Sequence, residues 1–272
     1  MSADARSSFR PGLFAGQVAL VSGGGSGLGS AIALRLAELG ADLALCGRRP
    51  EPLQQTAGAI RALGRRCETY PMSIRDPQAV AQLVDAVWRD FAGLDILVNN
   101  AGGQYAQAAI DFSTKGWAAV IDTNLNGPWY MMQAAARRWR DAARPGSIVN
   151  IVTVVARGQP GIAHTCAARA GVIHLSKTLA VEWAPWRLRV NCIAPGIMDT
   201  AGLDVYEPSA RQQFTRSNPM QHLGAPGDVA EACCYLAGPA GGFITGEVLT
   251  VDGGGQLWGE QWAIPRPAYF GG

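Results

Sequence analysis

The segment Val18–Gly29, with the sequence VALVSGGGSGLG, decides the fold that we expect for this chain. The apolar residues at 18–21 predict a buried strand, and apolar residues at helical spacing over 31–39 predict a helix directly after the glycines. Strand, glycine turn and helix in this order form the context that a dinucleotide-binding turn requires. The glycines let the backbone approach a pyrophosphate, and the helix N-terminus supplies free N–H groups and a partial positive charge. This context favours a phosphate-binding turn over an ordinary glycine loop.

Length and composition predict one globular α/β domain. At 272 residues the chain has ample material for a large buried core, and its 48% hydrophobic and 16% charged residues suit a soluble enzyme. The net charge of +2 gives no basic field for nucleic acid or a membrane surface, and no apolar run is long enough to span a bilayer. We therefore expect a small-molecule partner, with no nucleic acid and no membrane.

The termini and the cysteines indicate the compartment. The first residues, MSADARSSFRPG, lack the apolar core of a signal peptide, so we expect residues 1–13 to form a flexible leader. The six cysteines have no CxxC spacing and four of them lie in apolar patterns, which predicts buried free thiols in a reducing compartment and no metal site. The sequence ends in Phe270-Gly271-Gly272 without a peroxisomal address, and we expect a cytoplasmic location.

The remaining chain alternates between strand and helix patterns. Strands are expected at 41–46, 66–71, 95–98, 147–151, 188–193 and 247–254, and helices at 51–64, 77–91, 117–140 and 163–184. Because every link between strands is helix-sized, the fold class expected is α/β, a single doubly wound (Rossmann) domain over 14–255 with a seven-stranded parallel sheet and helices on both faces.

Two further segments have their own expected roles. Residues 198–224 have weak periodicity and many polar residues, and we expect them to form a lid over the substrate. The tail 256–272 carries Trp258, Trp262, Tyr269 and Phe270, which is too apolar for a free tail. We expect this tail to pack on a neighbouring subunit or on the active site.

The end of the second strand bears on cofactor choice. An acidic residue there would bind both ribose hydroxyls and favour NAD, whereas an arginine suits a 2′-phosphate. The chain has Arg48 and Arg49 at this end, and Asp42 lies at the opposite end of the strand. We expect NADP(H) to be preferred over NAD(H); the alternative is a solvated arginine pair.

Two motifs resemble the short-chain dehydrogenase/reductase family. The glycines fall as Gly23-xxx-Gly27-x-Gly29, and the fourth strand runs into Asn99-Asn100-Ala101-Gly102. The resemblance covers residues 14–255 and implies that Ser73 and Ile74 lie beside the adenine, where the family usually has Asp-Val. Together with the ribose argument, it implies cofactor contacts from Ser22, Gly23, Gly25, Ser26, Gly27, Leu28, Arg48, Arg49, Ser73, Ile74, Asn100, Ala101, Gly102, Arg169, Pro195, Gly196 and Ile197.

The resemblance also implies catalytic positions, and here the chain departs from the family. Asn124 matches the family asparagine that bends its helix and holds a water, and Asn126 is the weaker alternative. The Tyr-x-x-x-Lys positions hold Thr165 and Arg169, and Thr153, or Val152 beside it, stands near the serine position. A threonine hydroxyl does not titrate near neutral pH and an arginine does not give up its proton. This pattern argues against carbonyl reduction by the usual triad.

A narrower resemblance fits this departure. The runs at 102–104, 113–117, 147–152, 164–172 and 182–184 resemble peroxisomal trans-2-enoyl-CoA reductase, and those at 157–159 and 180–183 resemble peroxisomal 2,4-dienoyl-CoA reductase. These branches reduce carbon–carbon double bonds. The match is good in the middle of the chain and poor after residue 198. Ile173 stands where the enoyl-CoA reductase has a tyrosine, so that proton donor does not carry over.

The leading hypothesis is therefore an NADPH-dependent reductase of an enoyl-CoA-type substrate. Hydride addition places charge on the thioester oxygen, and the α-carbon then needs a proton. The candidate donors are His164, Thr153 and Thr165, with His164 first; its alternative role is that of a helix-start histidine bonded to backbone. The other hypotheses are a dehydrogenase or reductase of a hydroxy or keto fatty-acid or terpenoid compound, and a cofactor-binding scaffold without catalysis. The family resemblance also implies a homotetramer or homodimer.

Overall fold

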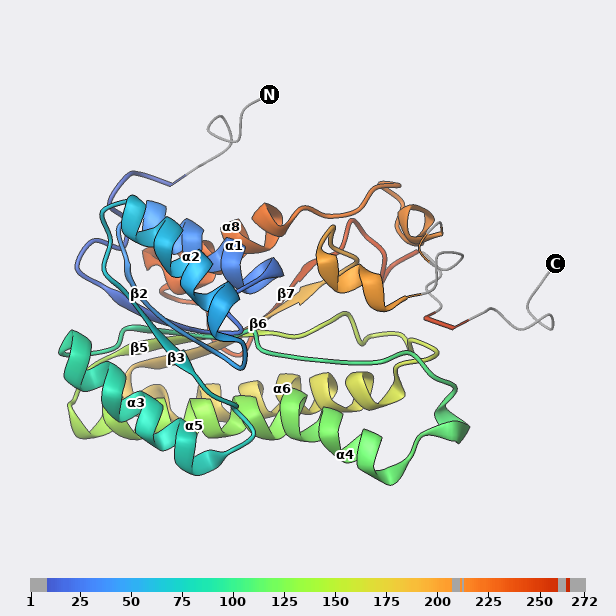
Figure 1. Cartoon of the computed structure of the whole chain (residues 1–272), viewed down its shortest axis with the longest axis horizontal. Helices are drawn as coiled ribbons and strands as arrows, with labels where there is room; N and C mark the ends of the chain where they lie inside the picture. Colours follow the sequence, from blue (N-terminus) through green and yellow to red (C-terminus); the bar gives the residue numbers. More distant parts are fainter. Residues whose placement is uncertain (1–8, 207–210, 212, 259–262, 265–272) are drawn as a thin grey trace.

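Seven parallel strands form the central sheet, as predicted. The computed structural model describes residues 9–206, 211, 213–258 and 263–264. The strands lie in the order β3-β2-β1-β4-β5-β6-β7 (Figure 1). Their bounds are β1 Val18–Ser22, β2 Asp42–Gly47, β3 Cys67–Pro71, β4 Ile96–Asn99, β5 Gly146–Ile151, β6 Leu188–Pro195 and β7 Val248–Val251.

Helices cover both faces of this sheet and close one core on each. Helices α1 (Gly27–Glu38), α2 (Pro50–Ala62) and α8 (Pro226–Ala237) lie on one face, above the sheet in Figure 1. Helices α3 (Pro77–Phe91), α4 (Thr114–Ile121), α5 (Gly127–Asp141) and α6 (Ala163–Glu182) lie on the other. The central strands are almost continuously apolar because both of their faces are buried. This confirms the doubly wound α/β prediction.

The order of the strands reverses at β1, which pairs with β2 on one side and with β4 on the other. In open parallel sheets, ligands bind outside the carboxyl ends of the strands at such a switch point. The glycine turn leaves β1 at this point, and the Asn-Asn-Ala-Gly segment leaves β4 beside it. The fold therefore brings the two motifs of the sequence together.

The helix expected at 117–140 begins earlier and is interrupted. It starts at Thr114, where the Ser113 hydroxyl accepts from the Gly116 N–H at 3.0 Å. Between α4 and α5 the chain forms a π-helical turn, Asp122–Asn126, with Asn124 almost fully buried. Such turns are rare and occur often at functional sites. The predicted bend at Asn124 thus takes the form of a widened helical turn.

The domain begins earlier than we expected. Phe9 and Leu13, which fall in the predicted flexible leader, pack against the hydrophobic core that contains buried residues of α1 and α8, and Phe14 is fully buried. Hydrophobic side chains here are held by the domain, so residues 9–13 belong to it. Of the aromatic tail, Trp258 is exposed, and Trp262, Tyr269 and Phe270 lie outside the described residues.

The serine that ends β1 ties the two motifs together. The buried Ser22 hydroxyl accepts from the backbone N–H groups of Asn100 and Ala101, each at 3.1 Å. The Asn100 side-chain amide donates in return to the carbonyls of Ser22 and Gly23, at 3.1 and 3.2 Å. This network fixes the loop after β4 against the glycine turn.

We predict that Ser22→Ala lowers the free energy of unfolding by about 2 kcal/mol, because two N–H groups lose their acceptor. Urea unfolding measures the change. Ser147→Ala is the matched control, since the Ser147 hydroxyl is also buried but has no hydrogen-bond partner in the described part of the chain. Its unfolding free energy should stay within about 0.5 kcal/mol of the parent value. Equal losses in both variants would contradict the role of Ser22.

Candidate active site

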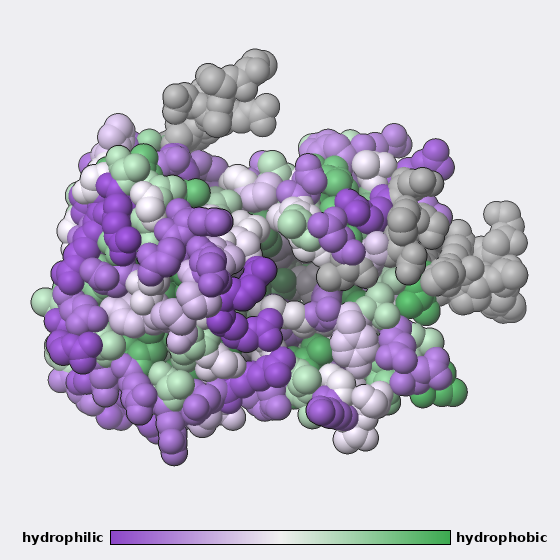
Figure 2. All heavy atoms as spheres, viewed as in Figure 1, coloured by the Kyte–Doolittle hydropathy of each residue, from purple (hydrophilic) through white to green (hydrophobic). Residues whose placement is uncertain are grey.

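A large pocket opens at the carboxyl ends of β1, β2, β3 and β4. This glycine-loop pocket has a volume of about 510 Å³. Figure 2 shows the same face of the molecule hollowed near its centre, with hydrophilic residues along the hollow. The pocket is lined by these residues from the set expected to contact the cofactor: Gly23, Gly25, Ser26, Leu28, Arg48, Arg49, Ser73, Ile74, Asn100, Ala101, Gly102 and Arg169.

The turn after β1 fits a pyrophosphate. Gly23 has a positive φ of 67°, and a Cβ there would lie 2.9 Å from Asn100 Nδ2, so only glycine is accommodated. A Cβ at Gly29 would collide with the Gly23 carbonyl oxygen. Ser26 precedes α1 in an extended conformation and makes no side-chain capping bond, and the first turn of α1 carries no acidic residue. The N–H groups of this helix end are thus available to an anion.

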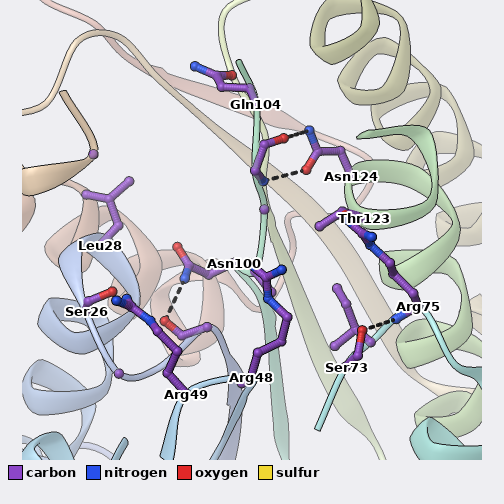
Figure 3. Close-up of a pocket in the computed structure, with 18 of the residues that line it drawn as sticks. Ser26, Leu28, Arg48, Arg49, Ser73, Arg75, Asn100, Gln104, Thr123 and Asn124 are labelled. Carbon is purple, nitrogen blue, oxygen red and sulfur yellow. Dashed lines mark hydrogen bonds between the residues drawn. The ribbon is translucent and has the colours of Figure 1, made fainter. Parts of the chain in front are cut away.

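Three arginines line the opposite part of the pocket. Arg48 and Arg49 point into it from the end of β2, and Arg75 points along its far wall (Figure 3). Arg75 Nε donates to Thr123 Oγ1 at 2.5 Å, which fixes that side chain. Asp42 is distant from these groups, because it pairs with Arg65 at the other end of β2, at 2.6 Å. No carboxylate lines the described pocket, so its field is positive.

A second, smaller pocket adjoins the first. It has a volume of about 230 Å³, and we call it the threonine pocket because Thr153 and Thr165 lie in its wall. The predicted residues Pro195, Gly196 and Ile197 line it as well, and the two pockets share Leu28, Gln104, Arg169 and Gly202. The expected lid segment contributes Met198, Thr200, Gly202, Leu203, Tyr206 and Phe214 to its wall.

Arg169 occupies the junction between the two pockets. Its side chain is buried, and a Cβ on Gly102 would collide with the guanidinium, which therefore lies against the glycine backbone. Within the described ranges it makes neither an ion pair nor a hydrogen bond. Burial lowers the pKa of Arg169 to about 10, so the group stays charged at neutral pH. A buried cation without a counter-ion is costly, and a bound molecule with hydroxyl or anionic oxygens would offset that cost.

His164 does not lie where we expected a proton donor. It is fully buried and lines neither pocket. Its ring stacks on Phe112 at a centroid distance of 4.4 Å and meets Tyr105 edge-on. Nδ1 accepts from the Thr165 N–H at 2.8 Å, and burial lowers the pKa of the imidazole, which is neutral. The helix turns this side chain away from the pocket, so the alternative role of a backbone-bonded histidine describes it.

Asn124 is held in place by the loop after β4. Its side chain lines the glycine-loop pocket, but Oδ1 accepts from the Gly103 N–H at 3.0 Å and Nδ2 donates to the Gly103 carbonyl at 2.9 Å (Figure 3). Both ends of the amide are therefore engaged by the loop after β4. Ser22 and Gly27 line neither described pocket, and Ser22 lies beneath the turn, where it holds the backbone.

Sequence reasoning missed two side chains that meet at this site. Tyr206 reaches the threonine pocket from the segment after β6, and its hydroxyl accepts a hydrogen bond from the Gln104 side-chain amide. The Tyr206 ring packs edge-on against buried Phe214, with centroids 5.3 Å apart. Neither Tyr206 nor Gln104 lies in a periodic pattern of the sequence. The only signal was Gln104 in the run Gly102-Gly103-Gln104.

Comparison with known proteins identifies the family. A family model described as enoyl-(acyl carrier protein) reductase matches residues 23–256. The chain belongs to the short-chain dehydrogenase/reductase family. It is similar to a Bacillus subtilis protein named "Probable 2,4-dienoyl-CoA reductase", with 35% identity over 253 residues that cover 91% of this chain and 97% of that protein.

Other relatives of this short-chain dehydrogenase/reductase have different names. The 3-oxoacyl-[acyl-carrier-protein] reductase FabG of Chlamydia trachomatis is 35% identical over 245 residues, 89% of this chain and 98% of that one. The solved structure of the citronellol catabolism dehydrogenase AtuB of Pseudomonas aeruginosa PAO1 has 36% identity and a TM-score of 0.82, covering 92% of this chain and 99% of that one. The chain is thus an NAD(P)-dependent oxidoreductase that acts on a small molecule.

Two classes of site are not found in the described residues. None of the helices there combines the length and apolar character that a membrane span needs. No group of three or more His, Cys, Asp or Glu side chains in the described ranges could hold a metal ion. Five of the six cysteines are buried and Cys166 is half-buried; all six are free.

We predict that Asn124→Ala weakens cofactor binding about tenfold, because two hydrogen bonds that hold the 102–104 backbone are lost. Fluorescence titration of NADPH measures the dissociation constant. Asn126→Ala is the control: its amide donates to Asp122 Oδ1 at 2.8 Å on the same turn and lines neither described pocket. Its dissociation constant should stay within about twofold of the parent value, and similar losses in both variants would argue against a specific role for Asn124.

Proposed function

We propose that this protein is an NADPH-dependent reductase of the carbon–carbon double bond in a 2-enoyl-CoA-type thioester. The observation that carries the proposal is the junction of the two pockets, where Arg169 and the threonine hydroxyls stand in place of a tyrosine–lysine pair. The name of the Bacillus subtilis relative, "Probable 2,4-dienoyl-CoA reductase", supports the same substrate class.

The chemistry of double-bond reduction suits these groups. Bound NADPH would supply hydride to the β-carbon, which leaves negative charge on the thioester oxygen. Arg169 keeps its charge at neutral pH, and the hydroxyls of Thr153 and Thr165 can donate hydrogen bonds in the same pocket. Fixed donors directed at a developing oxyanion stabilise the transition state. Oxidation of an alcohol would instead need a base with a lowered pKa, and neither threonine provides one.

The arginines that line the glycine-loop pocket support a preference for NADPH. Arg48 and Arg49 follow β2 at the position where a ribose 2′-phosphate would lie, and no described carboxylate lines the pocket to bind free ribose hydroxyls. Arg75 adds a third positive charge from the far wall of the same pocket. Arginine forks suit phosphate oxygens because they donate two parallel hydrogen bonds.

Two other functions are kept as alternatives. The names of the FabG and AtuB relatives favour a reductase or dehydrogenase of a keto or hydroxy compound, in which Thr153 and Thr165 would bind the reacting oxygen. A cofactor-binding scaffold is the third candidate.

We further propose a cytoplasmic location. We also propose assembly as a homotetramer or homodimer through α4, α5 and α6, which the exposed Val181 and Trp117 side chains support.

We predict NADPH oxidation with trans-2-enoyl-CoAs and at most about one-hundredth of that kcat/KM with matched 3-ketoacyl-CoAs and simple ketones, because the site lacks the usual acid–base pair. A spectrophotometric panel with purified protein measures these rates. Turnover on the ketones alone would establish the first alternative. Absence of turnover on every substrate, with NADPH still bound, would favour the cofactor-binding scaffold.

We predict that Arg48→Asp weakens NADPH binding about 30-fold and leaves NADH binding within about threefold, because a charge-assisted contact with the 2′-phosphate is replaced by repulsion. Titration of both nucleotides against the same protein gives the two dissociation constants. Arg137→Asp, which makes the same charge change on the exposed side of α5, is the control and should leave both constants unchanged. An unchanged ratio in the Arg48 variant would remove it from the ribose site.

A further inference from the structure

We propose that Tyr206 is the catalytic proton donor, and that Gln104 positions its hydroxyl for transfer to the substrate α-carbon. This inference rests on the proposed function. His164, the donor first expected, is turned away from the pocket by the fold. Tyr206 instead lines the threonine pocket and lies on the segment after β6.

The position of the Tyr206 hydroxyl carries the argument. Tyr206 lines the threonine pocket, and its hydroxyl accepts from the amide of Gln104, one of only four residues that line both described pockets. In the proposed reaction, a cofactor in the glycine-loop pocket would supply hydride to a substrate in the threonine pocket, so the reacting atoms would lie where the two pockets meet. The tyrosine hydroxyl is therefore held beside the reacting atoms rather than at the pocket mouth.

The composition of the threonine pocket leaves few other donors. Among its described lining residues, only Arg169 and Tyr206 carry a titratable proton. Arg169 is needed in its charged form to stabilise the oxyanion, and a guanidinium does not give up its proton in ordinary protein chemistry. Thr153 and Thr165 can donate hydrogen bonds but are poor acids. Tyr206 is the group that can both reach the junction and release a proton.

The surroundings of Tyr206 suit a donor rather than a base. Burial raises the pKa of the phenol, so it is protonated throughout the neutral range. The Gln104 amide donates to the phenol oxygen, and this hydrogen bond offsets part of the rise in pKa that burial causes. The same hydrogen bond stabilises the phenolate once the proton has left. An enolate carbon is a much stronger base than a phenolate, so transfer remains downhill.

The proposed reduction forms two new C–H bonds. Hydride forms the new C–H bond at the β-carbon, and the π electrons of the double bond move into the enolate. The enolate then forms a C–H bond at the α-carbon with the proton of Tyr206, whose O–H bond breaks and leaves its electron pair on the phenolate oxygen. Water returns a proton to the phenolate. NADPH is the reductant of the proposed reaction, and no other co-reactant is needed.

The test is Tyr206→Phe, which removes the hydroxyl but keeps the ring against Phe214. We expect kcat on an enoyl-CoA to fall about 100-fold, with KM and the NADPH dissociation constant within about threefold. Tyr235→Phe on the outer side of α8 is the matched control and should keep the parent kcat. In both variants, NADPH binding and thermal unfolding report on the fold independently of turnover.

A second readout separates proton donation from a structural role. In D₂O, the parent enzyme should place deuterium on one face of the α-carbon, because a fixed hydroxyl delivers it. Tyr206→Phe should deliver it from water to both faces, which NMR of the product detects. Gln104→Leu should lower kcat about tenfold and reduce the facial preference in part, since the hydroxyl remains but is no longer held.

The outcomes distinguish this inference from the proposed function. Parent turnover on enoyl thioesters, with a Tyr206→Phe variant that keeps both kcat and the facial preference, overturns the role of Tyr206 alone. A slow variant with an intact facial preference overturns it too, because Tyr206 would then only shape the pocket. Absence of parent turnover on enoyl thioesters overturns the proposed function and, with it, this step.

Discussion

One buried hydroxyl joins the two loops on which the whole site depends. Ser22 accepts from two successive N–H groups after β4, and Asn100 returns the connection to the carbonyls of the glycine turn. The turn has no room for side chains, because a Cβ at Gly23 would press on that same asparagine. The glycine turn before α1 and the Gly102 backbone, against which the Arg169 guanidinium lies, are therefore fixed by one packed contact between neighbouring strand ends.

Much of the fold follows from local patterns in the sequence. The continuous apolar strands and the helix-sized links between them require a parallel sheet covered on both faces, and the structure has it. The glycine turn and the Asn-Asn-Ala-Gly segment identify the edge of the sheet at which the pocket lies. Both motifs can be found in the sequence because each consists of residues close together in the chain. Helix α8 was not among the helices predicted from the sequence. Its N-terminus is nevertheless capped by Asp228, which accepts from the Ala225 N–H at 2.8 Å.

The chemistry of the pocket was harder to predict, because it depends on side-chain direction. His164 and Thr165 are adjacent in sequence, yet α6 directs Thr165 into the pocket and packs His164 on Phe112. Tyr206 and Gln104 lie 102 positions apart in loops without periodicity, so only the folded chain brings them together. Asn124 lines the glycine-loop pocket, and its amide bonds both backbone groups of Gly103, which no spacing argument reveals.

The π-helical turn at Asp122–Asn126 has a further consequence for how the domain tolerates change. It adds one residue to a turn, so the side chains of α4 are rotated relative to those of α5 by about 100° from where an uninterrupted helix would place them. α4 packs against α6 near the site, whereas α5 packs against α3 in the core. The turn therefore sets which face of α4 meets α6 and which face of α5 meets α3, and a deletion within it would rotate one set of contacts relative to the other.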